Sequence, residues 1–121
     1  NDYEARMLEE RTGKPIETLA QGVEAFIVTR GGNGSTIFTK GRRLEIPSVT
    51  PEAIVDPTGC GDAYRGGLLY GLRNGIDWEL TGRLASLIGS LKIAQRGAQN
   101  YAFTADEIDT RFSDAFGTRF R

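Results

Sequence analysis

The chain has 121 residues, of which 39% are hydrophobic and 26% charged, and its 15 basic side chains nearly balance 16 acidic ones. This length allows one soluble domain or part of one, and a net charge of −1 provides no field for holding nucleic acid or an anionic membrane. No stretch approaches the roughly 18 consecutive apolar residues that a membrane span needs. We therefore expect a soluble chain without nucleic-acid or membrane partners.

The residues available for chemistry are restricted, because the chain has one cysteine, Cys60, and no histidine. A single cysteine excludes an internal disulfide framework, and a Cys/His metal cluster is excluded as well. Acid–base chemistry must therefore use carboxylates or other groups. A reducing cytosol is the compartment that we expect.

The sequence begins at Asn1, without an initiator methionine and without the charged and apolar regions of a signal peptide. We therefore expect a fragment of a longer protein or a processed chain.

The first half of the chain favours two short helices followed by strands. Residues 3–10 favour a helix that ends in T-G-K-P at 12–15, and a second helical piece follows at 16–21. Strands are expected at 23–29, 35–39 and 44–47, separated by a glycine-rich turn at 30–34 and a hairpin turn at 41–43.

The second half favours a short strand followed by helices. The apolar run A-I-V at 53–55 favours a buried strand that ends in the turn at 56–62, and the next helix is expected around 63–72. Its apolar stripe contains Ala63, Leu68, Leu69 and Leu72. Three glycines in it indicate close packing against a neighbour: Gly66, Gly67 and Gly71. N-G at 74–75 ends this helix, a longer helix is expected at 78–96 before Gly97, and the capping box T-x-x-E at 104–107 starts a last helix through Phe112. This order of strands and helices predicts an α/β fold.

The turn at 56–62 is the strongest candidate for chemistry. Glycine makes up 16 of 121 residues, roughly twice its usual share of about 7%, so either the chain is loose or its backbone needs glycine at many positions. A glycine-rich turn at a helix N-terminus leaves N–H groups without partners beside the positive end of the helix dipole, and this geometry binds phosphate. Gly59 and Gly61 would let an oxyanion approach, and nearby amides would lower the pKa of Asp62 so that it accepts a proton. Alternatively, Asp62 is an ordinary N-cap and the glycines only shape the turn.

Two familiar phosphate-binding patterns are absent from this turn. The dinucleotide fingerprint G-x-G-x-x-G needs glycine at 64, where the chain has Tyr64. The P-loop pattern needs G-K-[ST], and the only G-K, at 13–14, is followed by Pro15.

The run D-P-T-G-C-G-D-A-Y-R-G-G-L-L at 56–69 closely resembles the second signature of the ribokinase-like (PfkB) carbohydrate kinases, D-x-x-G/A-x-G-D-x-x-x-G-G/A. Three further runs follow the order of the family: N-x-x-E at 1–4, T-x-G-x-x-G at 29–34, which resembles the nucleotide-binding turn, and R-G-A-Q at 96–99. The resemblance implies a three-layer αβα ribokinase-like fold. Residues 1–121 would form its C-terminal, nucleotide-binding and catalytic portion, without the N-terminal half and lid.

The resemblance implies an ATP-dependent kinase in which Asp62 is the catalytic base. Its carboxylate would deprotonate the accepting hydroxyl, which then attacks the γ-phosphoryl group of ATP in line. The backbone amides of Gly59, Cys60, Gly61 and Asp62 would form the anion hole that neutralises charge on the transferred group. Many members have alanine in place of Cys60, so we expect a structural thiol there and not a reactive one.

The resemblance also assigns nucleotide-binding roles near the start of the chain. Asn1 and Glu4 match the pair that organises the phosphates and a hydrated Mg²⁺, with Glu4 acting on the metal through water. Thr29, Gly31 and Gly34 match the wall around the nucleotide. The alternative for Asn1 and Glu4 is a plain N-terminal helix with solvated polar residues.

Some members of the family bind a potassium-like monovalent cation beside the anion hole. Its ligands here would be Asp56 and the carbonyl of Thr58. Further ligands would be the carbonyls near Lys92, Gln95 and Gly97. Tyr101 replaces the small polar residue that some members have after this segment. The alternative for Asp56 is that it braces the turn by accepting hydrogen bonds from backbone N–H groups.

The acceptor is predicted from finer resemblances. The signature with its following Arg65, together with L-K-I-A at 91–94 and G-A-Q-N at 97–100, looks more like the bacterial adenosine kinase-like branch than like sugar kinases. We therefore expect phosphorylation of a primary hydroxyl of a nucleoside such as adenosine, with a ribose- or fructose-type sugar as the alternative.

Two other interpretations stay open. The family builds its acceptor pocket largely from the N-terminal half, so we expect the isolated chain to be inactive, and a non-catalytic nucleotide-binding fragment is one alternative. A generic α/β module whose glycine turn is structural is the other.

Overall fold

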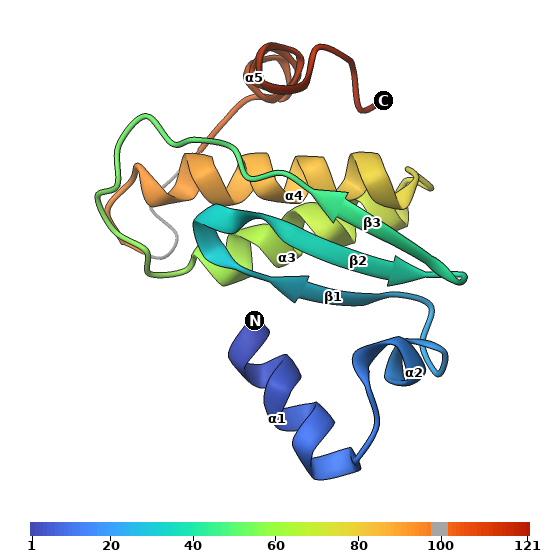
Figure 1. Ribbon diagram of the computed structural model, residues 1–121. Helices are drawn as coiled ribbons and strands as arrows, with labels where there is room; N and C mark the ends of the chain where they lie inside the picture. The colour runs from blue at the N-terminus through green and yellow to red at the C-terminus, as the bar shows by residue number, and fades with distance from the viewer. Residues whose placement is uncertain (98–101) are drawn as a thin grey trace. The chain divides into compact units, whose positions relative to one another are not determined.

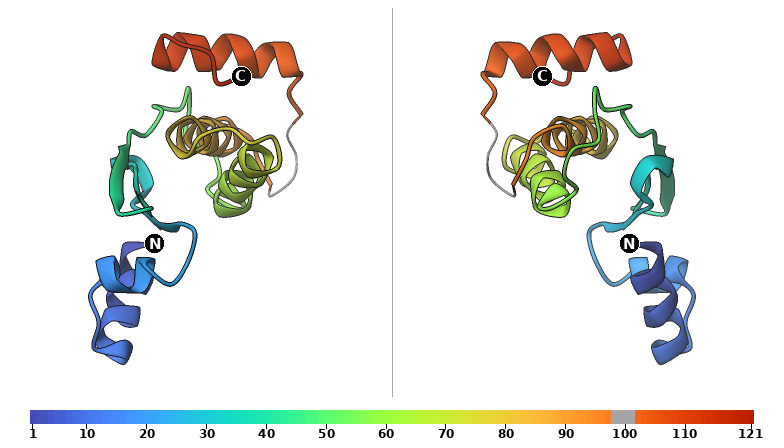
Figure 2. Two further views of the ribbon diagram at one scale, coloured as in Figure 1. Left: turned by 90° about the vertical axis from the view of Figure 1, so that its right-hand side faces the viewer. Right: turned by 90° about the vertical axis from the view of Figure 1, so that its left-hand side faces the viewer.

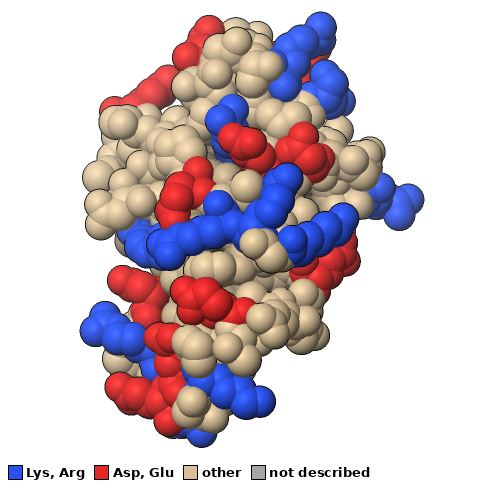
Figure 3. All heavy atoms as spheres, turned by 45° about the vertical axis from the view of Figure 1, so that its right-hand side comes forward, with Lys and Arg blue, Asp and Glu red and all other residues tan. Residues whose placement is uncertain are grey.

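The computed structural model describes residues 1–97 and 102–121, which form two compact units, Asn1–Pro47 and Ser48–Arg121 (Figure 1). Each unit has its own hydrophobic core. The face drawn in Figure 3 carries both basic and acidic side chains, with a continuous row of basic atoms across its middle. Within the described ranges, no helix has the length and apolar character needed to cross a membrane.

The first unit opens with the two predicted helices, α1 (Asp2–Thr12) and α2 (Ile16–Ala20). Asn1 caps α1, and Gly13 ends it with a φ of 68°, in the left-handed region that favours glycine. An oxygen of the Glu9 carboxylate accepts a hydrogen bond from the backbone N–H of Ile16 at 3.1 Å. The end of α1 therefore satisfies the first N–H group of α2.

A three-stranded antiparallel sheet completes this unit, with β1 (Phe26–Thr29), β2 (Ser35–Thr39) and β3 (Arg42–Ile46) in the order β1-β2-β3. A short 3₁₀ turn, η1 (Gly31–Asn33), lies between β1 and β2. Lys40 and Gly41 join β2 to β3 with φ angles of 50° and 73°, and two positive φ angles are what a tight hairpin turn requires. The turn expected at 41–43 is therefore shifted, because Arg42 and Arg43 pair with β2, and β1 begins at Phe26 and not at 23.

The core of the first unit joins its helices to its sheet. Ala5 of α1, Ile16 of α2, Val28 of β1 and Phe38 of β2 are buried together. Each comes from a different element, so removal of this cluster from water is what holds α1 and α2 on the strands.

In the second unit, α3 (Cys60–Arg73) packs along α4 (Trp78–Ile93) (Figure 2). The face of α3 that is buried consists of small residues four positions apart, Ala63, Gly67 and Gly71. A Cβ at Gly67 would lie 2.7 Å from the Cα of Ala85, and one at Gly71 would collide with the side chain of Thr81. Two glycines therefore permit the close approach of the helices, as expected.

The predicted apolar stripe of α3 is only partly buried. Leu69 is 65% exposed and Leu72 is 50% exposed, and a Cβ at Gly66 would meet nothing within 4 Å. These three expectations were wrong because the helix turns its small residues, and not its leucines, toward α4.

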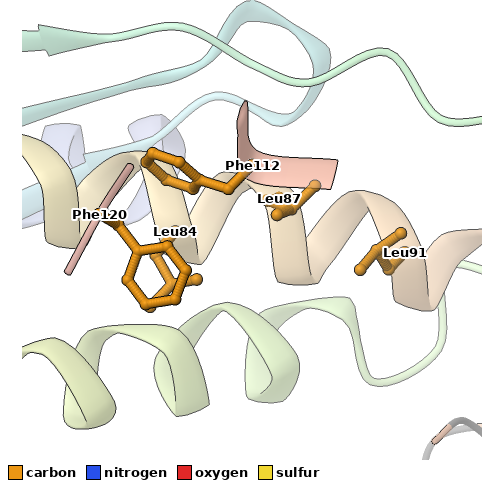
Figure 4. Close-up of a cluster of buried hydrophobic side chains, with 5 residues drawn as sticks. All are labelled: Leu84, Leu87, Leu91, Phe112 and Phe120. Atoms are coloured by element: carbon orange, nitrogen blue, oxygen red, sulfur yellow. The ribbon is translucent and has the colours of Figure 1, made fainter. Parts of the chain in front are cut away.

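The other side of α4 contacts α5 (Ala105–Phe116), which begins at the predicted capping box of Thr104 and Glu107. Figure 4 shows the cluster of buried side chains that α4, α5 and the C-terminal segment share. Its members are Leu84, Leu87, Leu91, Phe112 and Phe120. The rings of Phe112 and Phe120 meet edge to face with centroids 5.0 Å apart, so aromatic packing fixes the C-terminal segment on α5.

Phe112→Ala is expected to lower the free energy of unfolding by about 3–5 kcal/mol, because the fully buried ring contacts both Phe116 and Phe120 and its loss leaves a cavity. Urea unfolding measures the change. Leu69→Ala, on the exposed face of α3, is the control and should change stability by less than about 0.5 kcal/mol. Equal effects of the two variants would contradict the assigned core.

Other predictions also differ from the structure: α3 begins at Cys60 and not at 63, and α5 continues past Phe112 to Phe116. Residues 53–55 form no strand: Ile54 is 76% exposed, and the N–H groups of Val55 and Asp56 donate to the carbonyl of Ile93 at 2.9 and 3.1 Å. The end of α4 therefore takes the bonds that a sheet neighbour would provide. That helix ends at Ile93 and not at 96.

Candidate active site

Asp56 organises the turn that leads into α3. One oxygen of its carboxylate accepts from the N–H of Thr58 at 2.9 Å, and the other accepts from the N–H of Gly97 at 2.7 Å. Hydrogen bonds from the side chain and backbone of Thr58, and then from the backbone of Gly97, hold the pKa of Asp56 well below its usual range. The alternative that Asp56 braces the turn through backbone N–H groups is confirmed.

The lowered pKa of Asp56 predicts a loss of stability in acid. Because this carboxyl binds protons less readily in the folded chain than in the unfolded chain, its contribution is present above its ordinary pKa of 3.8 and is lost as the pH falls below it. Asp56→Asn should be less stable at pH 7 and should lose less stability on acidification. Urea unfolding across pH 2–7 at constant ionic strength checks this, and parallel pH profiles of the two proteins would contradict it.

The N-terminus of α3 presents backbone donors. Gly59 precedes the helix with a φ of 80°, a left-handed conformation that an L-residue with a side chain rarely adopts. The N–H of Cys60 donates to the carbonyl of Pro57 at 3.1 Å, and the N–H of Ala63 makes the first helical bond, to Gly59, at 2.9 Å. The amides of Gly61 and Asp62 lie between these two and, by helix geometry, have no helical acceptor.

Gly61 is not required by the packing of the chain itself. A Cβ there would meet only the Nη1 atom of Arg65, at 3.8 Å. The space that a side chain at position 61 would fill is therefore open, and the positive end of a 14-residue helix favours an anionic ligand.

Asp62 occupies the third position of α3 and is not the N-cap, because Gly59 holds that position. The N-cap alternative is therefore wrong. The side chain of Asp62 is 82% exposed, and its Oδ1 atom accepts from Nη1 of Arg65 at 2.9 Å. An exposed carboxylate beside the helix amides is accessible to a substrate hydroxyl, and the ion pair with Arg65 orients it.

Cys60 is half-buried at the start of α3. Burial raises the pKa of its thiol, and the charge of Lys92 only partly opposes this effect. A raised pKa disfavours the nucleophilic thiolate, which supports a structural role.

In the first unit, Asn1 and Glu4 form the capping box of α1. Oδ1 of Asn1 accepts from the N–H of Glu4 at 2.9 Å, and an oxygen of Glu4 accepts from the N-terminal ammonium group of Asn1 at 2.6 Å. Both side chains are more than half exposed. A single accessible carboxylate suits Mg²⁺, an ion that keeps most of its water ligands. In the described part of the chain, no group of three or more His, Cys, Asp or Glu side chains is arranged to hold a metal ion.

The turn at 29–34 links β1 and β2. Thr29 pairs with Ser35 at the end of the ladder, and the N–H of Arg30 donates to the carbonyl of Gly34 at 2.8 Å. Gly31 and Gly34 have φ angles of 55° and 84°. Positive φ explains both glycines, and these two positions carry no side chain that would obstruct a ligand.

Lys92, near the C-terminal end of α4, is fully buried. Its Nζ atom donates to the carbonyl of Asp56 at 2.8 Å and to the carbonyl of Gln95 at 3.0 Å. Both residues belong to the ligand set expected for a monovalent cation. An ammonium group of the chain therefore bonds two residues of the set expected to hold such a cation.

The sequence pattern of the pfkB family carbohydrate kinases matches residues 1–105. The chain belongs to this family. The nucleoside kinase of Methanocaldococcus jannaschii is 36% identical over 96 residues, which are 79% of this chain and 32% of that relative. The pfkB family chain thus spans about a third of the length of this curated relative.

Solved structures also resemble this pfkB family chain. Burkholderia thailandensis nucleoside kinase in complex with inosine superposes with a TM-score of 0.95 at 54% identity, over 98% of this chain and 39% of that one. A structure of Methanocaldococcus jannaschii nucleoside kinase, an archaeal member of the ribokinase family, gives a TM-score of 0.88 at 32% identity over 93% of this chain and 38% of that one. The fold is therefore a portion of the ribokinase-like α/β fold.

The structure groups the predicted site residues within each unit. Residues 56–62 lie together with Lys92 and Gly97 in the second unit, whereas Asn1, Glu4 and the turn at 29–34 belong to the first. Ala98, Gln99 and Tyr101, named in the sequence-based predictions, lie outside the described residues.

Sequence reasoning missed two side chains of this pfkB family site, Arg65 as the partner of Asp62 and Lys92 as a buried cation. A signal for the second was present. Lys92 follows Leu84 by eight residues and Ile88 by four, which places its charge on the apolar face of the predicted helix.

Proposed function

We propose that the chain is the nucleotide-binding and catalytic-base portion of an ATP-dependent kinase that phosphorylates a primary hydroxyl of a nucleoside. The observation that carries this proposal is the exposed Asp62 carboxylate on the first turn of α3, next to helix amides without helical acceptors. A proton acceptor and an anion-binding surface are the two groups that phosphoryl transfer to a hydroxyl needs from a protein.

The N-terminus of α3 is the anion hole of this proposal. Gly59 sets the turn by its positive φ, and the amides of Gly61 and Asp62 face the charge that develops on the transferred phosphoryl group. The Cys60 amide belongs to the same predicted set. It donates to the carbonyl of Pro57, so it contributes to the anion hole when it shares this hydrogen bond with the phosphoryl group or gives it up. Donors that are already oriented cost no reorganisation during the reaction.

Asp62 is the base. It takes the proton of the acceptor hydroxyl, a bond forms between the acceptor oxygen and the γ-phosphorus, and the bond from that phosphorus to the β–γ bridging oxygen breaks to release ADP. The Arg65 guanidinium holds Oδ1 of the carboxylate, which leaves Oδ2 for the proton.

The nucleotide and its metal ion use the first unit. Asn1 and Glu4 organise the phosphates and a hydrated Mg²⁺, and the turn with Thr29, Gly31 and Gly34 lies against the nucleotide. When bound, Mg²⁺ neutralises phosphate charge during the transfer. The exposure of Asn1 and Glu4 and the absence of side chains at Gly31 and Gly34 support these roles.

A nucleoside is favoured as acceptor over a sugar. Two relatives described above are nucleoside kinases, and the Burkholderia thailandensis enzyme, 54% identical to this chain, was solved with inosine. Adenosine, expected from the sequence, and inosine are both purine nucleosides with a primary hydroxyl on ribose, so this class is our proposal. A ribose- or fructose-type sugar is the second candidate.

An acceptor screen of the full-length protein with Mg-ATP tests the proposal. Adenosine, inosine, a pyrimidine nucleoside, ribose and fructose 6-phosphate are supplied singly, and kcat/KM is measured from ADP release. We expect the purine nucleosides to give the highest values. A preference for ribose or fructose 6-phosphate would replace the nucleoside by a sugar, and saturable ATP binding without turnover would favour a non-catalytic nucleotide-binding protein.

A further inference from the structure

A buried positive charge lies beneath the turn that feeds α3. The ammonium group of Lys92 has no exposure and donates to the carbonyls of Asp56 and Gln95 at 2.8 and 3.0 Å. A buried charge is tolerated only where it has partners. Here the partners are two backbone carbonyls, that of Asp56 at the start of the turn and that of Gln95 just after α4.

Further hydrogen bonds around the lysine join the start of the turn to the residues at the end of α4. The amides of Val55 and Asp56 donate to Ile93, and the amide of Gly97 donates to the Asp56 carboxylate at 2.7 Å. The carboxylate is thus occupied by backbone donors, and the lysine bonds the carbonyl of the same residue. The ammonium therefore completes a link between the turn and the end of α4.

In a potassium site, backbone carbonyl oxygens surround one positive charge. The ammonium group of a lysine carries the same charge as K⁺. Asp56 and Gln95 are two of the residues that the family resemblance assigns to a monovalent cation. Their carbonyl oxygens cannot surround an added cation while the lysine lies between them, because two positive charges would compete for the same acceptors.

We propose that the side chain of Lys92 is the resident cation of this turn, so that the protein does not need K⁺ to order the segment 56–59 that positions the N-terminus of α3. Lys92 is a positioning residue, since it contacts only backbone oxygens of the turn and of Gln95. The inference rests on these contacts, and its thermal readout does not depend on the proposed kinase activity.

The first test uses the unaltered full-length protein. Its melting temperature is measured in chloride salts of K⁺, Na⁺ and tetramethylammonium at equal ionic strength. We expect the K⁺ and tetramethylammonium values to agree within about 1 °C, a shift that corresponds to a small fraction of the stability of a domain. A K⁺-specific, saturable rise of several degrees would overturn the proposal.

The second test compares two substitutions that remove the charge. Lys92→Ala leaves room for an added cation, whereas Lys92→Met fills the space with an apolar chain of similar length. Both should melt roughly 5 °C or more below the unaltered protein, because charged hydrogen bonds are lost. K⁺ or NH₄⁺ should restore a large part of the loss in Lys92→Ala and little of it in Lys92→Met.

Lys40→Ala, which alters an exposed lysine of the β2–β3 hairpin, is the control and should show no cation dependence. If K⁺ and NH₄⁺ restore neither Lys92 variant, the lysine does not stand in for a cation and the proposal fails. If the variants do not fold, the salt dependence of the unaltered protein still decides the question.

Discussion

Asp62→Asn in the full-length protein is expected to lower kcat by roughly 10²–10⁴-fold, the range that a positioned general base contributes. The amide has almost the shape of the carboxylate and can still accept a hydrogen bond from Arg65, but it cannot take the proton of the acceptor hydroxyl. The amides of the helix N-terminus are unchanged, so the affinity for ATP should stay within a few fold. Single-turnover kinetics and calorimetric titration with ATP measure the two quantities separately.

Arg65→Gln is the matched control for this substitution. It removes the ion pair to Oδ1 of Asp62 but keeps the carboxylate, so kcat should fall far less than in Asp62→Asn. If Arg65→Gln reproduced the whole loss, orientation of the side chain and not proton transfer would explain the effect. Retained turnover in Asp62→Asn would exclude Asp62 as the base.

Neighbouring glycines of α3 are expected to respond to alanine in opposite directions. At Gly67 a Cβ would lie 2.7 Å from the Cα and 3.0 Å from the backbone nitrogen of Ala85. Backbone atoms cannot turn away as a flexible side chain can, so Gly67→Ala must separate α3 from α4. Overpacking of this kind costs about 1–3 kcal/mol, and we expect a loss at the upper end of that range.

Gly66→Ala should instead raise the free energy of unfolding by about 0.5–1 kcal/mol, because a Cβ at Gly66 meets nothing within 4 Å and alanine is the better helix former. Urea unfolding of the two variants under the same conditions measures both effects. A stabilising Gly67→Ala would mean that the helices are not in close contact. A destabilising Gly66→Ala would mean that a segment beyond the described residues packs on that face.

Features that depend on a few adjacent residues were predictable from the sequence. The capping box T-x-x-E starts α5 where the pattern indicates, and Gly13 ends α1. Strand β2 was predicted with its observed bounds, Ser35–Thr39, because turn residues flank it on both sides. In each case the signal lies within one turn or one hairpin.

Features that depend on distant partners were not predictable. The run at 53–55 has the composition of a buried strand, yet the N–H groups of Val55 and the following Asp56 bond the end of α4, almost forty residues later in the sequence. Leu69 looks like a core residue, but which face of α3 is buried depends on how closely α4 approaches Gly67 and Gly71. Composition alone contains neither piece of information.

The candidate site divides in the same way. The glycine-rich signature predicted that residues 56–62 form the site. The structure adds the hydrogen-bond partner of each group: Asp56 bonds the turn, Asp62 bonds Arg65 and the Cys60 amide bonds Pro57. The lysine at the centre of the predicted cation set was unexpected, because its bonds join residues 36 apart in the sequence. The glycine excess is explained in part by positive φ at Gly31, Gly34 and Gly59.

The most direct test of the central claim is the product balance of the full-length protein with Mg-ATP and a purine nucleoside. We predict that ADP and the nucleoside monophosphate, phosphorylated on the primary hydroxyl, appear in equal amounts and that neither forms without the nucleoside. Phosphorus NMR of the reaction identifies both products in one sample. Release of ADP and inorganic phosphate without a phosphorylated nucleoside, or no reaction while ATP binds, would contradict the assignment of residues 56–62 to phosphoryl transfer.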